Sequence, residues 1–458
     1  MKILYGGLTK AHDFLIKGAL ENLGYDAEPL PTPDNEALKV GKEFCNKGQC
    51  NPTYYTVGNL VKYLLEKRKN GEKEIEKKYV FVTVGSCGPC RFGMYEMEYK
   101  KAVKEAGFPD FKILAFDQSR AALEEINLAG IRFDRKFFLN LMKAIILGDL
   151  INDVYYKVKP YEEVPNSADE WKEQSLYILY EALRSGKNLF KALKEVKSKL
   201  DSVRVNYFQP KPKVKIMGEF FAQTTEGDGN YKMAKWLIEE GAEPIVEPVS
   251  TWIEYLIYEK FLETKERAFK DRVKALKIIY LIKLLHLYFR GVYNLYRFAL
   301  GNKPDPLKSQ RKLAEYAQDY YNVRLSGGEG HMEVGKHIYM VKHRKAHMVI
   351  SVKPFGCMPS TQSDGVQSKV IEDLGGSIFV SVETSGDAET NVKSRILMKL
   401  YEAKLKAFEE YERAKEELKV KDEDVEKAIM KNPTLKKASL KLPAKYISTS
   451  ANALLLVK

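Results

Sequence analysis

The sequence predicts an α/β protein with two parallel-sheet domains and helical insertions. The chain has 458 residues, more than one ordinary hydrophobic core accommodates, so at least two domains are expected. Hydrophobic residues make up 45% of the chain and charged residues 30%, a balance typical of globular proteins and not of fibrous or disordered ones. Short strand-type runs alternate with helix-length segments in both halves of the chain, which is the pattern of βαβ units.

Strand and helix signals alternate regularly through the first 120 residues. Strands are expected at 2–5, 27–30, 79–84 and 111–116, and helices at 10–23, 53–68 and 95–106. Gly24 and Gly107 follow two of these helices, where glycine commonly ends a helix. Strands separated by helices of this length form a parallel sheet with right-handed crossovers.

The second half of the chain repeats this alternation after a helical stretch. Helical periodicity runs from about 119 to 205, and a linker is expected at 206–213. Strands follow at 214–221, 244–249, 346–352 and 377–382, with helices at 230–240, 365–374 and 391–418 and a basic, aromatic helical region at 252–300. The predicted division is an N-terminal α/β domain (1–120), a helical region and linker (121–212), a second α/β domain (213–430) with a helical insertion (252–320), and a C-terminal tail (431–458).

Charge and cysteine usage bear on partners and compartment. The net charge of +13 admits nucleic acid or anionic ligands, but no nucleic-acid module accompanies it, so a solvated Lys/Glu-rich surface is the favoured interpretation. Five cysteines in so long a chain, and the absence of a signal-peptide core, predict a reducing, cytoplasmic location. No transmembrane segment is expected, because Lys277, Lys283, Arg290 and Arg297 interrupt the most apolar stretch.

The cysteines are the strongest functional signal. Cys45 and Cys50 form a C-x4-C pair, Cys87 and Cys90 form a C-x2-C pair, and Cys357 lies in the far half of the chain. Each is expected in a loop at the carboxyl end of a parallel strand, where open α/β sheets build their sites. Thiolates from distant loops select zinc or an iron-sulfur cluster, and the spacing favours iron-sulfur without excluding zinc.

A thiol-disulfide oxidoreductase is the rival interpretation. The tetrapeptide Cys87-Gly88-Pro89-Cys90 matches the thioredoxin motif and lies between a predicted strand and a helix. Ser86 stands where such enzymes usually have an aromatic residue, and the motif follows the third strand of a longer βαβ series. Dithiol exchange is therefore kept as the alternative.

Three segments around the cysteines carry a family resemblance. They are GKEFCNKGQCNPTYYTVGNLVKYL, VGSCGPCRFGMYEMEYKKAVKEAGFPDFKILAFDQS and KPFGCMPSTQSDGVQSKVIEDLGGSIFVSVETSGDAETNVKSR, and residues 218–255 fit the second domain of the same group. The chain resembles the 2-hydroxyglutaryl-CoA dehydratase component-like superfamily along nearly its whole length. It is most similar to the acyl-CoA dehydratase activase-related branch, often labelled "CoA protein activase".

The resemblance implies two Rossmann-like or flavodoxin-like domains that hold an iron-sulfur cluster in the cleft between them. It further implies a partner, an ATP-hydrolysing activator of the sugar-kinase/actin type, which delivers a low-potential electron. Relatives use this electron to dehydrate 2-hydroxyacyl-CoA, to reduce benzoyl-CoA, or to reduce small molecules at a double-cubane cluster. The chain has no P-loop and no D-x-G-[ST] phosphate loop, so it is expected to be the electron acceptor, with an acyl-CoA or small-molecule substrate.

The cysteine count limits which cluster the resemblance implies. Five cysteines are too few for an all-cysteine double cubane unless two chains share it, so a 4Fe-4S cluster is favoured and a homodimer is left open. The proposed ligands are Cys50, Cys87, Cys90 and Cys357, with Cys45 as an alternate. A cluster or zinc carrier without catalytic activity is the second functional alternative.

Polar residues after other strands complete the candidate set. Gly6 and Gly7 precede a helix and could bind an anion, although a tight strand-to-helix turn is the favoured explanation. Thr225, Glu383 and Ser385 follow strands of the second domain and are candidates for positioning substrate or shuttling protons. Helix capping by their neighbours is the structural alternative.

Overall fold

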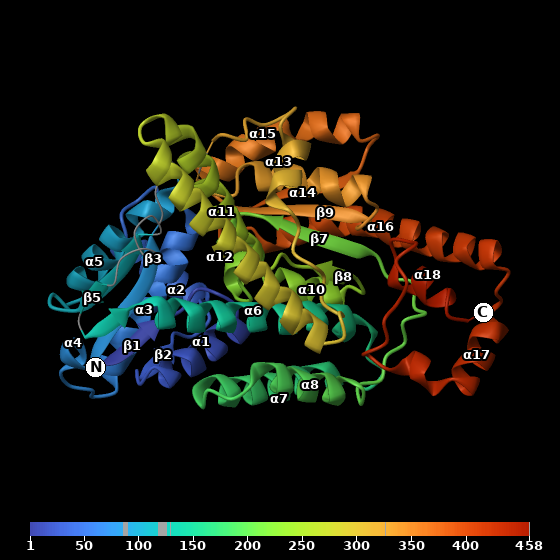
Figure 1. Cartoon of the computed structure of the whole chain (residues 1–458), viewed down its shortest axis with the longest axis horizontal. Helices are drawn as coiled ribbons and strands as arrows, with labels where there is room; N and C mark the ends of the chain where they lie inside the picture. The colour runs from blue at the N-terminus through green and yellow to red at the C-terminus, as the bar shows by residue number, and fades with distance from the viewer. Residues whose placement is uncertain (86–89, 118–125, 129, 326, 458) are drawn as a thin grey trace.

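Two four-stranded parallel sheets organise the chain (Figure 1). The computed structural model describes residues 1–85, 90–117, 126–128, 130–325 and 327–457. The predicted α/β class with two parallel-sheet units is thereby confirmed. In these residues no helix is long and apolar enough to cross a membrane.

The first sheet has the strand order β2-β1-β3-β4. Its strands are β1 (Lys2–Tyr5), β2 (Ala27–Pro29), β3 (Tyr79–Gly85) and β4 (Lys112–Asp117). Side chains of β1 alternate between its two faces: Ile3 and Tyr5 enter one core, and Leu4 enters the other. Because apolar side chains project from both faces of the sheet, both faces are covered by helices.

Helices cover both faces of the first sheet. One face packs against α3 (Asn51–Lys69) and α5 (Tyr95–Glu105). The other packs against α1 (Lys10–Asn22) and α6 (Arg135–Val158), with α7 (Ser167–Arg184) and α8 (Leu189–Leu200) stacked outside. The helices expected at 121–212 therefore share one hydrophobic core with the N-terminal sheet.

The second sheet has the strand order β10-β9-β7-β8. Its strands are β7 (Lys213–Gly218), β8 (Glu243–Ile245), β9 (Met348–Pro354) and β10 (Ile378–Thr384). One face packs against α10 (Met233–Glu239) and α16 (Glu389–Leu418), and the other against α14 (His331–Lys342). The helix α15 (Met358–Asp373) follows β9 and lies beside α14.

Three local expectations are wrong. A helix, α2 (Asn35–Phe44), occupies the expected loop before Cys45, begun by Asp34, whose side chain accepts from the Ala37 N–H. A short antiparallel pair, β5 (Ile126–Leu128) and β6 (Ile131–Phe133), interrupts the stretch expected to be helical. The strand expected at 214–221 ends at Gly218, and α9 (Phe220–Thr224) begins after Glu219, whose carboxylate accepts from the Ala222 N–H.

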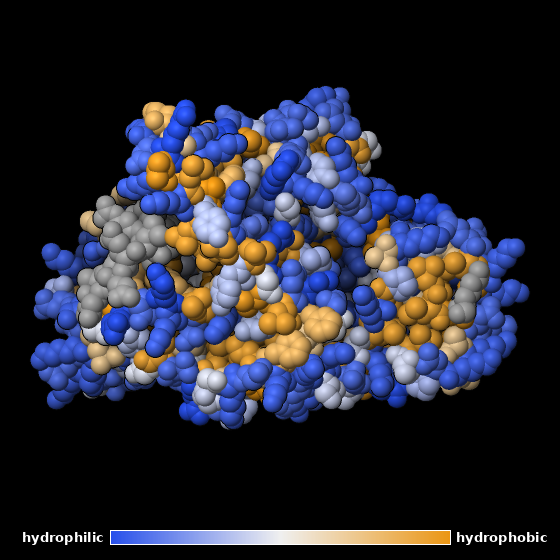
Figure 2. All heavy atoms as spheres, in the orientation of Figure 1, coloured by the Kyte–Doolittle hydropathy of each residue, from blue (hydrophilic) through white to orange (hydrophobic). Residues whose placement is uncertain are grey.

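A long helical hairpin interrupts the second sheet between β8 and β9. It consists of α11 (Val249–Glu266) and α12 (Arg272–Ala299), followed by α13 (Gln310–Ala317). The carboxyl-terminal part of α12 packs into the core of the first domain through Phe289 and Tyr293. Its amino-terminal part is exposed, and Figure 2 shows apolar side chains following α12 across this face.

Candidate functional site

Three cysteines from the two sheets lie at the boundary between the domains. Cys50 precedes α3, Cys90 follows β3, and Cys357 follows β9 and precedes α15. Two of these positions are at the carboxyl ends of parallel strands, as expected. Cys45 and Cys50 are not directly after the second strand, because α2 lies between that strand and both cysteines. We call Cys50, Cys90, Cys357 and their loops the cysteine site.

Backbone contacts hold the three loops together. The Asn51 N–H donates to the Phe355 carbonyl at 3.4 Å, which joins the loop before α3 to the loop after β9. Arg91, directly after Cys90, donates to the Gly48 carbonyl. A side chain at Gly356 would come within 3.6 Å of the Arg91 guanidinium and 3.8 Å of the Cys50 Cα. Arg91 therefore lies where the three cysteine loops meet, and Gly356 has a φ of +78°, a backbone conformation that favours glycine.

Cys50 and Cys357 are buried and Cys90 is half-buried, and burial disfavours ionisation of Cys90 and Cys357. Cys50 Sγ lies 3.1 Å from the Tyr95 hydroxyl and 3.3 Å from the Thr53 hydroxyl, within hydrogen-bond range. Burial raises the pKa of Cys90 to about 12, and it also raises the pKa of Cys357. Cys90 and Cys357 are thus protonated at neutral pH unless a cation compensates them.

Three carboxyl groups of the second domain, the half-buried Glu219 and the buried Glu329 and Glu333, lie near the cysteine site. Burial raises the pKa of Glu219 to about 7, and burial together with Glu219 raises the pKa of Glu329. Their charges also oppose ionisation of Cys90 and Cys357. Glu333 accepts from the hydroxyls of Ser360 (2.8 Å) and Ser363 (2.5 Å) at the start of α15.

The remaining two cysteines differ from this group. Cys45 ends α2 and lies in the core between α3 and α5, where burial and then Glu98 raise its pKa to about 12. The charged groups that shift its pKa belong to the N-terminal domain. Cys87 lies outside the described residues.

The chemical type of these ligands, thiols, suits a soft metal centre. The three described thiols come from both domains and are buried or half-buried, and soft thiolate donors select zinc or an iron-sulfur cluster. Two cations lie close by: Lys353 interacts electrostatically with Cys357, and Arg91 directly follows Cys90. Within the described ranges, no three His, Cys, Asp or Glu side chains are close enough together to hold a metal ion. The three described thiols alone are therefore not a ready-made ligand set, and Cys87 lies outside those ranges.

Carboxylates of the second domain fill the expected anion site after Gly6 and Gly7. The Lys10 N–H, at the start of α1, donates to Glu226 at 2.7 Å. The Asn35 N–H, at the start of α2, donates to Asp228 at 3.0 Å. The loop after α9 thus supplies one carboxylate to each of two helix N-termini in the first domain, which matches the charge preference of those ends. This arrangement favours an interdomain contact over an external anion.

Thr225, Glu383 and Ser385 serve local structure in different places. Thr225 is buried and accepts from the Gly227 N–H at 3.4 Å, and the Ser385 hydroxyl donates to Asp387 at 2.7 Å. Glu383 lines an open pocket of about 370 Å³ beside Lys353 and Arg395, between β10 and the start of α16. The structure does not bring these three side chains to one point.

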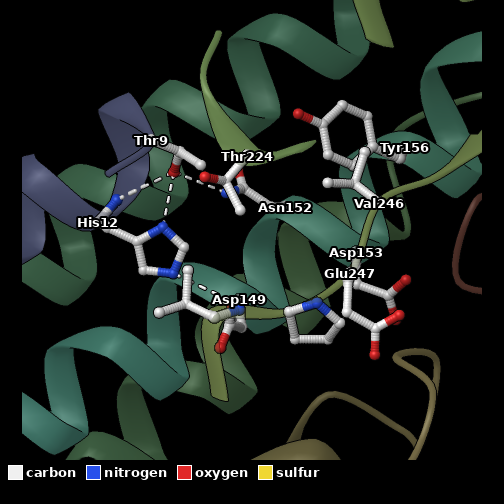
Figure 3. A pocket seen from close by; sticks show the side chains of 11 residues that line it. Thr9, His12, Asp149, Asn152, Asp153, Tyr156, Thr224, Val246 and Glu247 are labelled. Carbon is white, nitrogen blue, oxygen red and sulfur yellow. Dashed lines mark hydrogen bonds and ion pairs between the residues drawn. The ribbon is translucent and has the colours of Figure 1, made fainter. Parts of the chain in front are cut away.

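A second buried polar region joins the domains beneath α1 (Figure 3). The His12 ring lies 2.7 Å from the Thr9 hydroxyl and 3.1 Å from Asp149. Asp149 also accepts from the N–H groups of Val249 and Ser250 at 2.7 Å each, at the start of α11. The adjoining cavity of about 20 Å³ admits one water molecule and no substrate. We call Thr9, His12, Asp149 and these two N–H groups the His12–Asp149 network, and its role is structural.

Two residues of the candidate site escaped the sequence analysis. Glu219 directly follows Gly218 at the carboxyl end of β7, a position that could have identified it as a site residue. Arg91 directly follows the C-x2-C motif, but only the tertiary structure shows that it joins the three loops.

Comparison with known proteins adds no family assignment: no protein-family model and no curated protein matches this chain. Its function must therefore be inferred from its own residues and their arrangement.

Proposed function

We propose that the chain binds an iron-sulfur cluster, most simply 4Fe-4S, at the cysteine site. In this proposal it accepts a low-potential electron from a separate ATP-hydrolysing activator. It then uses the electron in reductive or dehydratase chemistry on an acyl-CoA or small-molecule substrate. The observation that carries the proposal is that the loops bearing Cys50, Cys90 and Cys357, which belong to both domains, contact one another at the domain boundary. The family resemblance of the surrounding segments adds the activator and the substrate class.

The chain's own residues have distinct roles in this proposal. Cys50, Cys90 and Cys357, with Cys87 from the C-x2-C motif, are the ligands, and a bound cluster supplies one-electron reduction. Arg91 holds the loop after β3 against the loop before α3. Glu219 and Glu329 hold protons at their carboxyl oxygens near neutral pH, next to the thiols. The site can therefore deliver protons as well as an electron.

Anaerobic purification with analysis of iron, acid-labile sulfide and zinc tests the proposal. A 4Fe-4S cluster predicts about four iron and about four sulfide per chain, with a paramagnetic signal after reduction. A protein with one zinc per chain and no sulfide would contradict it. We expect Cys357→Ser to lose most of the iron and Cys45→Ser to retain it, because Cys357 lies in the cysteine site and Cys45 does not.

Two further assays separate the functional alternatives. Turnover of an acyl-CoA or a small reducible substrate, with activator and ATP present, distinguishes a catalyst from a cluster carrier. Reduction of insulin disulfides by the metal-free protein tests dithiol exchange at Cys87 and Cys90. Insulin reduction that survives Cys357→Ala, in a protein that binds no cluster, would favour the oxidoreductase.

A further inference from the structure

The helix α16 exposes a stripe of large apolar side chains on the side opposite its core-facing residues. Ile396, Leu400 and Ala403 are fully buried against the second sheet. The opposite side holds Met398, Tyr401, Leu405 and Phe408, which are 70%, 66%, 45% and 53% exposed. Contiguous exposed apolar surface of this kind marks an interaction site.

The spacing of the stripe suits pairing with an identical helix. Successive residues of the stripe are three, four and three positions apart, so the stripe reads the same in both directions. Alternating spacings of three and four keep side chains facing a partner helix along its length. In an antiparallel pair, Met398 lies opposite Phe408 of the other copy, and Tyr401 lies opposite Leu405.

The charges of α16 are segregated along its length. Residues 389–406 contain five basic and two acidic residues, a net charge of +3. Residues 407–418 contain two basic and five acidic residues, and without the buried Glu410, which bonds to the C-terminal segment, their net charge is −2. Antiparallel pairing of two copies sets each basic half against the acidic half of the other copy. Parallel pairing would oppose like charges, so the charge pattern selects the antiparallel arrangement.

The exposed face of α12 does not have this self-complementarity. Between 272 and 299 the helix has six basic residues and no acidic residue. Two copies paired through α12 would oppose positive charges in either orientation. Although it is the larger apolar surface, the exposed face of α12 is therefore the poorer candidate for contact with a second copy.

We propose that the chain forms a twofold-symmetric dimer through antiparallel contact of α16 with α16 of a second copy. Each exposed side chain of the stripe contributes roughly 100 Å², and flanking residues bring the total to about 1,000 Å² over both copies. This area is at the lower limit for a specific interface, so we expect a dissociation constant of about 1–10 μM. Figure 1 shows α16 along an outer edge of the second domain. The contact involves no cysteine and does not depend on the proposed function.

Light scattering coupled to size-exclusion chromatography, and sedimentation equilibrium of the full chain from about 0.5 to 100 μM, test the dimer. We expect a concentration-dependent dimer in the wild type. Tyr401→Glu should raise the dissociation constant at least about 100-fold, because symmetry introduces the charge twice. The matched control is Tyr280→Glu on α12, since both tyrosines are 66% exposed, and it should leave the dimer intact.

Three outcomes would overturn the proposal. They are a wild type that stays monomeric throughout the range, a dimer insensitive to Tyr401→Glu, and a dimer lost in Tyr280→Glu instead. Unchanged circular dichroism and melting temperature will show that the variants are folded, as expected for exposed positions.

A charge exchange tests the antiparallel orientation. Arg395 of one copy is expected near Glu409 of the other, so Arg395→Glu and Glu409→Arg should each raise the dissociation constant about tenfold. The double variant should restore it. Arg395 also donates to the Ser381 carbonyl at 3.1 Å, and the loss of that local bond would persist in the double variant. A double variant weaker than either single variant would rule out the orientation.

Discussion

The two buried polar regions that join the domains differ in how their groups are compensated. In the His12–Asp149 network, both oxygens of Asp149 accept backbone N–H groups and the His12 ring has a partner on each nitrogen. At the cysteine site, burial raises the pKa values of Cys90, Cys357, Glu219 and Glu329 without full compensation. A compensated network stabilises the fold, whereas an uncompensated cluster of potential ligands gains stability only when something binds.

The largest expected effect on stability comes from a substitution in the His12–Asp149 network. Asp149→Ala leaves His12 and two N–H groups of α11 without their acceptor in a site where Asp149 is 3% exposed. We expect a loss of about 3–5 kcal/mol in the free energy of unfolding, measured by chemical denaturation. Asp319→Ala, at an exposed position, is the control and should change it by less than about 0.5 kcal/mol. A loss below about 1 kcal/mol for Asp149→Ala would show that the network does not hold the domains together.

A pair of helical glycines tests how closely the same network is packed. A Cβ at Gly148 would lie 2.5 Å from the His12 ring, so Gly148→Ala should destabilise the protein by about 1–3 kcal/mol. Gly291 on α12 has no atom within 4 Å of the added Cβ, so Gly291→Ala should stabilise it by about 0.5–1 kcal/mol. The two melting temperatures should therefore shift in opposite directions. Equal shifts would contradict the close approach of His12 to α6.

Substitution at the cysteine site should affect stability far less than ligand binding. Cys357→Ser in the metal-free protein removes no strong interaction, so we expect a change of about 1 kcal/mol or less in the free energy of unfolding. The same variant should lose most of its iron when purified without oxygen. A loss of stability comparable to that of Asp149→Ala would mean that Cys357 is a structural residue and not a ligand.

The sequence predicted the fold class because its signals are local. Alternation of strand and helix periodicity identified both parallel sheets, and the helix-ending residues Gly24 and Gly107 lie just past α1 and α5. The helix α2 was missed because its stability depends on close contact with α3. A Cβ at Gly41 or Gly58 would come within 1.9 Å of a carbonyl oxygen of the other helix. No local pattern reveals a contact of that kind.

The candidate site was predictable in part because strand ends, too, have local sequence signals. Cys90 and Cys357 follow strands, so their position at the sheet edge could be inferred from the sequence. The carboxylates of Glu226 and Asp228 that occupy the starts of α1 and α2 come from more than 190 residues away, so the anion site expected at Gly6 and Gly7 could not be distinguished from an interdomain contact.

The smallest expected effect is a pH-dependent one at Glu226, which also joins the two domains. Burial would raise its pKa, but Lys172 and the Lys10 N–H outweigh burial and hold the pKa below the usual 4.5. A lowered pKa stabilises the fold above the unfolded-state value and loses that contribution as pH falls through the folded-state value. Glu226→Gln should therefore cost about 0.5 kcal/mol at pH 7 and progressively less below pH 4.5. Lys172→Met should show the same convergence in acid, because it removes the main cause of the lowered pKa. A difference between wild type and Glu226→Gln that grows as pH falls would contradict an ionised interdomain contact.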